Sequence, residues 1–117
     1  MYNRGDIVKV YYDLPNSKNT NYHPAVILSN ELVYYADDIY VCAMLTSQDK
    51  IDLFSFELTQ SMLSMKNNKD FSQVRCHLVT YIKETHIVPH SKMNTVHLHI
   101  VDSIIDQINE TVFKDLK

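Results

Sequence analysis

The stretch from residue 23 to residue 30 reads His23-Pro24-Ala25-Val26-Ile27-Leu28-Ser29-Asn30 and is the densest structural signal in the chain. Four apolar residues stand between a polar segment and a Ser-Asn pair that favours a stop. A short apolar run with such boundaries predicts a buried β-strand at residues 24–29. A proline at the start of the strand is tolerated because that residue need not donate to a ladder. His23, at the start of this strand, is therefore the first candidate for a catalytic residue.

Further strands are predicted on both sides of this run. Residues 6–12 are rich in β-branched and aromatic side chains, and residues 39–46 form a near-continuous apolar run typical of a central strand. Residues 53–58 alternate, which predicts a half-buried strand with Phe54 and Phe56 inward. Two or three more short strands are predicted within residues 73–79 and 80–88. Polar connections are predicted at 13–22, 47–52 and 59–70, and a loose helical turn within 30–38.

The last segment changes its hydrophobic period. Apolar residues recur at spacings of three and four between residues 96 and 112, which predicts an amphipathic helix. Asn94 or Thr95 is a suitable N-cap for it. The opposite face carries a row of acidic side chains, namely Asp102, Asp106 and Glu110. This row is either a solvated helix face or a contact for a basic partner.

Strands followed by a helix indicate the α+β class. We predict a single domain over residues 1–117, built as a small SH3-like antiparallel β-barrel of five to seven strands with a C-terminal α-helix packed outside it. The chain has 117 residues, of which 45% are hydrophobic, and this is enough for one core but not for two.

Composition restricts the function. The single glycine excludes a glycine-rich phosphate loop, and the net charge of −3 argues against broad nucleic-acid binding. Cys42 and Cys76 stand in apolar segments and are predicted to be reduced core residues. His97 and His99, two apart on the predicted helix, are expected on different faces, and no metal-ligand spacing appears, so we expect neither a metal nor another cofactor. With no apolar run near ~20 residues and no apolar N-terminal signal region, we expect a cytoplasmic protein without membrane association.

Three short motifs follow one another in a fixed order: Arg4-Gly5-Asp6-Ile7-Val8, the stretch from His23 to Asn30, and Ala43-Met44-Leu45-Thr46-Ser47. A fourth run, residues 72–82, precedes the final helix. In order and spacing, over nearly the whole chain, they resemble the MazF/PemK toxins of bacterial toxin–antitoxin pairs. The resemblance implies a dimeric SH3-like barrel and a metal-independent endoribonuclease that cuts single-stranded RNA at short sequences. It also implies an antitoxin whose disordered segment covers the RNA site.

The resemblance also assigns residues. The family's strand usually opens with Arg-Pro, and that arginine acts in proton transfer and charge stabilisation; here the position holds His23. Thr46 matches the family's threonine, whereas the family's late Gln-Ile-Arg-Thr pattern reads Leu78 and Thr80 at its glutamine and arginine. Histidine titrates near neutrality and can act as base or acid, and a threonine hydroxyl can donate to a phosphoryl oxygen. His23 and Thr46 are therefore the candidate catalytic residues. The candidate substrate-binding residues are Arg4, Lys18, Ser47 and Arg75.

A second interpretation stays open. The protein is either this ribonuclease or a non-catalytic member of the same fold that binds a protein or nucleic acid without cutting it. The missing arginines and the net negative charge favour the binding module, whereas Thr46 and the complete order of motifs favour the enzyme.

Overall fold

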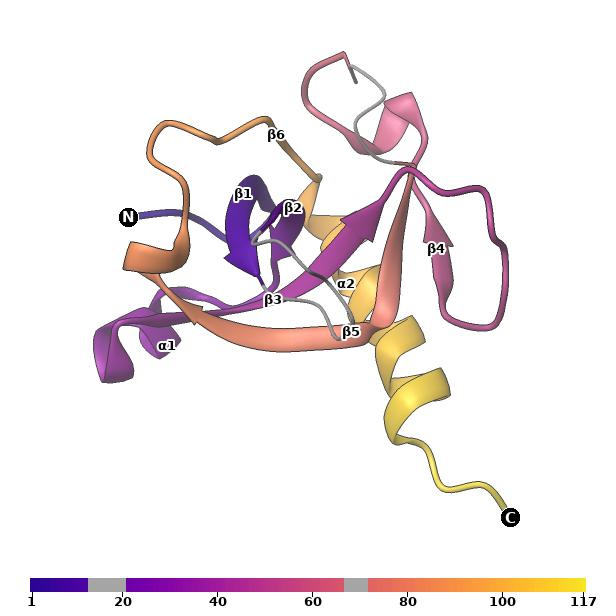
Figure 1. Ribbon diagram of the computed structural model, residues 1–117. Helices are drawn as coiled ribbons and strands as arrows, with labels where there is room; N and C mark the ends of the chain where they lie inside the picture. Colours follow the sequence, from indigo (N-terminus) through magenta and orange to yellow (C-terminus); the bar gives the residue numbers. More distant parts are fainter. Residues whose placement is uncertain (13–20, 67–71) are drawn as a thin grey trace.

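The computed structural model describes residues 1–12, 21–66 and 72–117, which form a curled antiparallel sheet with a C-terminal helix (Figure 1). The six strands lie in the order β4-β5-β3-β2-β1-β6. This confirms the α+β class and the strand number predicted from the sequence. The elements are β1 (Asp6–Tyr12), β2 (Asn21–Ile27), α1 (Glu31–Asp37), β3 (Ile39–Thr46), β4 (Ser55–Glu57), η1 (Gln60–Met62), β5 (Gln73–Lys83), η2 (Glu84–His86), β6 (Asn94–Thr95), α2 (Leu98–Ile108) and the single-turn π-helix η3 (Asn109–Phe113).

Alternation along the strands gives the sheet one apolar cluster on each face. In the β1–β2 register Ile7 pairs with Val26 and Val8 pairs with Ala25, so the two pairs point to opposite faces. The helix-side core joins the first pair to three α2 residues, namely Val101, Ile104 and Ile108. The far-side core consists of Val8, Val10, Ala25, Ile27, Tyr40, Cys42, Met44, Ile82 and Ile87.

Strand β2 starts earlier and ends earlier than predicted. It begins at Asn21, in a segment expected to be loop, and ends at Ile27 rather than Ser29. Pro24 therefore lies inside the strand. It is tolerated there because β3 pairs with β2 only from Ala25 onward, so no ladder with β3 exists at the proline. The rest of the predicted 13–22 loop lies outside the described residues.

Strand β5 corrects the prediction of two or three short strands within residues 73–88. It is one strand that ends at Lys83 and is followed by the η2 turn. Its register with β3 jumps, because Ala43 pairs with Val79 while Leu45 pairs with Val74. On the β3 side, residues 75–78 therefore stand opposite Met44 alone, while Arg75 also pairs with Ser55 of β4. This bulge interrupts the alternation of β5, and bulges are common beside functional sites.

Strand β4 is shorter than the predicted half-buried strand. It covers three residues, but Phe54 and Phe56 pack against the helix-side core, as predicted. The connection after β4 holds a 3₁₀ turn, η1, within the segment 59–70 that was predicted to be a polar connection.

Both helices have clear starts. The Asn30 side chain accepts a hydrogen bond from the backbone N–H of Leu32, which makes residues 31–37 a capped helix rather than a loose turn. Helix α2 starts after His97, which corrects the predicted cap at Asn94 or Thr95. Those two residues are not available to cap the helix because they pair with β1 as strand β6.

The helix surface follows the predicted pattern in part. Asp102, Asp106 and Glu110 are exposed, and Asp102 forms an ion pair with Arg4. The rings of His97 and His99 stack nearly parallel, with centroids 6.0 Å apart, so the expectation that they lie on different faces is wrong. The reason is that His97 precedes the first helical turn.

Two further expectations concern the cysteines and the membrane. Cys42 and Cys76 are both buried and free, as predicted. In the part of the chain that the structure describes, no helix is long and apolar enough to cross a membrane.

Candidate active site

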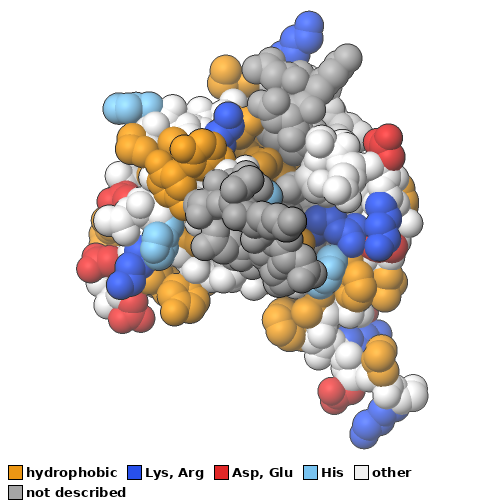
Figure 2. Space-filling model, in the orientation of Figure 1, with side chains coloured by type: hydrophobic (Ala, Val, Ile, Leu, Met, Phe, Trp, Pro, Cys, Tyr) orange, Lys and Arg blue, Asp and Glu red, His pale blue; other side chains and the backbone are white. Residues whose placement is uncertain are grey.

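A groove lies at the end of β3, on the face of the sheet opposite α2. Its first part is a cavity of about 240 Å³ lined by His23 from β2, Thr46 from β3 and Arg75 from β5. Met44, a member of the far-side core, and Leu78, which packs against that core, line the same cavity. Three residues predicted from separate segments of the sequence are thus brought together. Figure 2 shows Lys, Arg and His side chains gathered to the right of centre, over β4 and β5.

The groove continues into a second hollow of about 220 Å³. The two hollows share four lining residues, namely Thr46, Gln48, Arg75 and Leu78. The second hollow adds Lys50, Gln73 and His77. We refer to both hollows together as the groove.

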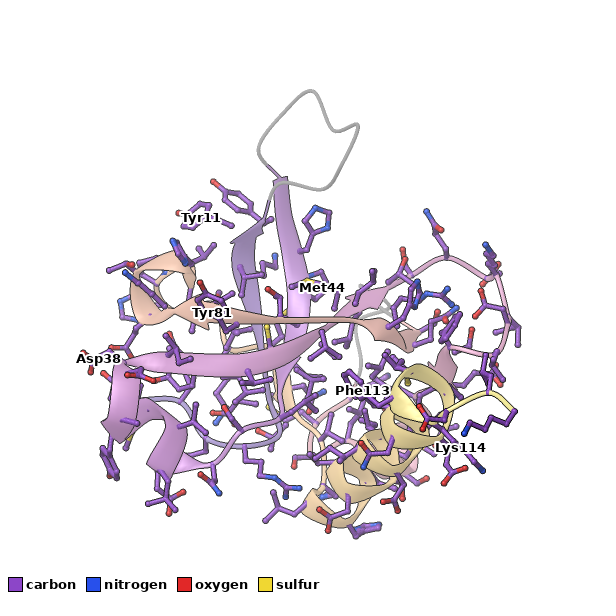
Figure 3. The ribbon with its side chains drawn as sticks, turned by 90° about the horizontal axis from the view of Figure 1, so that it is seen from below. Tyr11, Asp38, Met44, Tyr81, Phe113 and Lys114 are labelled. Carbon is purple, nitrogen blue, oxygen red and sulfur yellow. The ribbon has the colours of Figure 1, made fainter. Side chains whose placement is uncertain are left out.

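His23 owes its position to the β1–β2 register. It pairs with Val10, a residue of the far-side core, and stands two residues before Ala25, which pairs with Met44. This alternation points His23 to the same face as Met44. Figure 3 shows Met44 on that inner stretch of the sheet, where β2 meets β3. His23 is half-buried there, so one part of the imidazole packs while another reaches the cavity.

Thr46 is the last residue of β3 and is oriented by the connection that follows it. Its hydroxyl oxygen accepts a hydrogen bond from the backbone N–H of Gln48 at 3.2 Å. That contact uses an oxygen lone pair and leaves the hydroxyl proton for donation. Thr46 can therefore donate toward the cavity. Ser47, the next residue, is exposed.

Arg75 is held by an ion pair with both oxygens of Asp52. Its Nη1 donates to Oδ1 at 3.0 Å and its Nη2 to Oδ2 at 2.9 Å, and Nη1 also donates to Ser55 Oγ at 2.9 Å. The hydrogen bond from Arg75 lowers the pKa of Asp52 to about 2. The guanidinium is therefore rigid, and one carboxylate already balances much of its charge.

Sequence reasoning missed Gln73, which is 1% exposed. Its Nε2 donates to the backbone carbonyls of Gln48 at 3.0 Å and Lys50 at 2.7 Å, while its Oε1 accepts from Arg75 at 3.0 Å. One amide thus fixes both the connection after β3 and the arginine. The available signal was the polar residue that opens strand β5 and shares its alternation with Arg75.

His77 was also missed. Its ring packs against Phe54 with centroids 4.5 Å apart, and the residue is exposed. Burial of the ring, and then the charge of Arg75, lower the pKa of His77 below its ordinary value of 6.5. The signal was the series of polar residues at every second position of β5, namely Gln73, Arg75 and His77.

Two predicted residues that the structure describes, Arg4 and Ser47, do not line the groove. Arg4 donates from Nε to the backbone carbonyl of Leu28 at 3.2 Å and pairs with Asp102 of α2. Leu28 lies five residues beyond His23, which is about 16 Å of extended chain. Lys18 lies outside the described residues. Within residues 1–12, 21–66 and 72–117, no group of three or more His, Cys, Asp or Glu side chains is arranged to hold a metal ion.

Comparison with known proteins identifies the class. Residues 3–112 match the family model described as PemK-like, MazF-like toxin of type II toxin-antitoxin system, and the chain belongs to this family. No curated protein matches the sequence closely enough to count as a relative.

Solved structures give the same fold. A mycobacterial endoribonuclease in complex with its cognate antitoxin is 13% identical, with a TM-score of 0.70 and 100% of both chains covered. A MazE-MazF complex from Deinococcus radiodurans is 10% identical, with a TM-score of 0.73 and 97% of both chains covered. MazF alone from the same organism aligns with the same values.

Proposed function

We propose that this protein is a metal-independent endoribonuclease that cleaves single-stranded RNA by attack of a 2′-hydroxyl on the adjacent phosphate. The observation that carries the proposal is the meeting of His23, Thr46 and Arg75, from three different strands, in one cavity. Membership of the toxin family supports it, and one of the similar structures is described as an endoribonuclease.

The groove supplies the chemistry that such a cleavage needs. The reaction requires a base for the 2′-hydroxyl proton, an acid for the leaving 5′-oxygen and donors for the charge that develops on the phosphoryl oxygens. His23 can fill one of the two proton-transfer roles near neutral pH, which the family's arginine performs less readily. Thr46 donates its hydroxyl proton to a phosphoryl oxygen. The products are a 2′,3′-cyclic phosphate and a 5′-hydroxyl.

RNA binding involves the groove and residues around it. The positive charge of Arg75 attracts the phosphate, and the negative charge of Asp52 reduces that attraction. Ser47 stands directly after Thr46, where a hydroxyl can contact the same strand of RNA. We assign Arg4 to the path of the RNA beyond the groove, because it lies at the opposite end of β2. Lys18, outside the described residues, is proposed as an RNA contact on its charge alone.

We also propose a homodimer. An apolar groove of about 310 Å³ runs between the sheet and the end of the helical segment, lined by Val41, Val79, Ile105 and others. Phe113 stands at its rim with 67% of its surface exposed, and Tyr81 on β5 is 65% exposed (Figure 3). Exposed apolar side chains of this size favour a partner surface. Sedimentation at micromolar concentration should show a dimer that Phe113→Asp converts to a monomer.

The natural inhibitor is proposed to be an antitoxin that covers the RNA groove in the cytoplasm. The similar structures include a mycobacterial endoribonuclease in complex with its cognate antitoxin and a MazE-MazF complex, which supports a protein partner. Expression of the protein alone should stop growth, and the product of a small neighbouring gene should restore it.

The decisive experiment uses a long mixed-sequence RNA with a chelator present. We expect short fragments with cyclic phosphate ends, and a rate that falls about 100-fold or more in His23→Ala and about tenfold or more in Thr46→Ala. His86→Ala and Thr85→Ala, at exposed positions outside the groove, are matched controls and should cut like the unaltered protein.

RNA that stays intact at high protein excess would overturn the ribonuclease. The binding-module interpretation would then take its place, and retention of RNA on the unaltered protein, lost in Arg75→Ala, would support it.

A further inference from the structure

We propose that His77 is a second acid–base residue of the groove and acts with His23 on opposite sides of the scissile phosphate. The inference rests on the proposed ribonuclease function and deepens it, because it assigns both proton transfers. Neither the family's sequence pattern nor the predicted site residues include His77.

The two hollows of the groove carry the argument. His23 lines the first hollow and His77 lines the second, while Thr46 and Arg75 line both. We place the scissile phosphate at Thr46, which both hollows share, with His23 in one hollow and His77 in the other. In-line displacement needs this arrangement, because the attacking 2′-oxygen and the leaving 5′-oxygen lie on opposite sides of phosphorus. Each proton-transfer group must come within about 2.6–3.2 Å of its oxygen when RNA is bound.

Alternation along the first part of β5 brings His77 to the groove. Val74 and Cys76 are buried in the helix-side core, so Arg75 and His77 point to the opposite face and line the second hollow. The bulge breaks this alternation only after His77, where Leu78 also lines the groove and Val79 packs against the helix-side core. The contact with Phe54 then fixes the plane of the imidazole, while the residue stays exposed to an incoming strand of RNA.

The charges around His77 decide which role it takes. Arg75 on β5 and Lys50 on the connection before β4 lower its pKa, as does burial, and Asp52 on the same connection raises it. The net shift is downward, so the neutral imidazole predominates at pH 7. A neutral imidazole is a base, so we assign the 2′-hydroxyl proton to His77, and His23, in the other hollow, is left to protonate the leaving 5′-oxygen.

The step balances without a co-reactant. The 2′-hydroxyl proton passes to the neutral ring of His77 as the 2′-oxygen forms its bond to phosphorus. The bond from phosphorus to the 5′-oxygen breaks, and that oxygen takes a proton from the imidazolium of His23. The two histidines then return to their starting forms by exchanging protons with water.

The test is a single-turnover cleavage series from pH 5 to pH 9 on the mixed-sequence RNA with chelator. We expect a bell-shaped rate profile for the unaltered protein. His77→Asn should cut about 100-fold more slowly and lose the acidic limb of the bell, whereas His23→Asn should lose the alkaline limb. Added imidazole should restore part of the rate to His77→Ala. His86→Asn is the matched control.

The outcomes separate the two proposals. A rate for His77→Asn within threefold of the unaltered protein, with the acidic limb unchanged, overturns the role of His77 while leaving the ribonuclease intact. An unaltered protein that does not cut overturns both. Should His77→Ala and His77→Asn unfold, His77→Gln, which keeps a polar side chain of similar length against Phe54, makes the same measurement.

Discussion

Strand β3 meets a polar cluster at each end, and the two clusters differ in what surrounds a single carboxylate. At its start, beside α1, the Glu84 carboxylate accepts hydrogen bonds from the hydroxyls of Tyr34 at 3.1 Å and Tyr40 at 3.0 Å (Figure 1). The Tyr40 hydroxyl in turn accepts from the backbone N–H of Tyr2 at 3.0 Å, and Tyr40 is 2% exposed. This end of the far-side core is sealed.

At its other end β3 opens into the groove. There the carboxylate is Asp52 and its donor is the charged Arg75, with histidines lining the hollows on either side. At the sealed end two neutral phenols donate to Glu84, with the N-terminal ammonium 3.9 Å away. At the open end a guanidinium holds the carboxylate and two imidazoles line the hollows. We infer that the sealed end serves stability and the open end serves chemistry.

The largest effect is expected at the sealed end. Tyr40→Ala removes a fully buried ring from the far-side core and should lower the free energy of unfolding by about 4 kcal/mol. Urea unfolding measures this. Thr46→Ala, at the open end of the same strand, should change stability by less than about 0.5 kcal/mol while it slows RNA cleavage. Equal losses of stability in the two variants would contradict the division of roles.

An intermediate effect on stability is expected at Gln73, the buried residue that supports the open end. Gln73→Leu keeps the side-chain volume but leaves the carbonyls of Gln48 and Lys50 without their donor. We expect a loss of about 2 kcal/mol in urea unfolding, with slower RNA cleavage because Arg75 also loses a partner. Gln48→Leu, which alters an exposed side chain beside it, is the control and should leave stability nearly unchanged.

The strands and the final helix could be predicted from the sequence because hydrophobic period reports burial directly. Residues 39–46 read as a central strand, and β3 has those bounds. The hydrophobic period does not predict the structure where pairing with neighbouring strands, rather than burial, decides it. The bulge of β5 depends on its register with β3, and the start of α2 depends on the pairing of Asn94 with β1.

The same limit explains which site residues were found. His23, Thr46 and Arg75 were proposed, and they line one cavity. Arg75 could be named as a cation, but its neutralisation could not be foreseen, because Asp52 is 23 residues away in sequence. His77 continues the alternation of Gln73 and Arg75, but the sequence alone does not show that this face of β5 meets the end of β3.

A smaller effect tests the sealed end at high pH. Burial is the main cause that raises the pKa of Tyr40, to about 12. Because the folded pKa is the higher one, the stability from this phenol is complete below pH 10 and is lost between pH 10 and about 12. Tyr40→Phe should therefore show a shallower loss of stability over that range. Tyr35→Phe, at an exposed tyrosine of α1, is the control, and an unchanged slope in Tyr40→Phe would argue against the buried phenol.

The smallest effect tests the open end at low pH. Arg75 holds the pKa of Asp52 at about 2, below its ordinary value of 3.8, so the ion pair stabilises the fold above pH 4 and this contribution disappears as the pH falls toward 2. Asp52→Asn should flatten the acid limb of the stability curve, whereas Asp49→Asn, at an exposed position of the same connection, should not. At pH 7 the same change frees the charge of Arg75, so RNA should bind more tightly and with a steeper salt dependence. Weaker binding by a folded Asp52→Asn protein would mean that Asp52 serves to aim the guanidinium, and that its orientation matters more to the groove than its unbalanced charge.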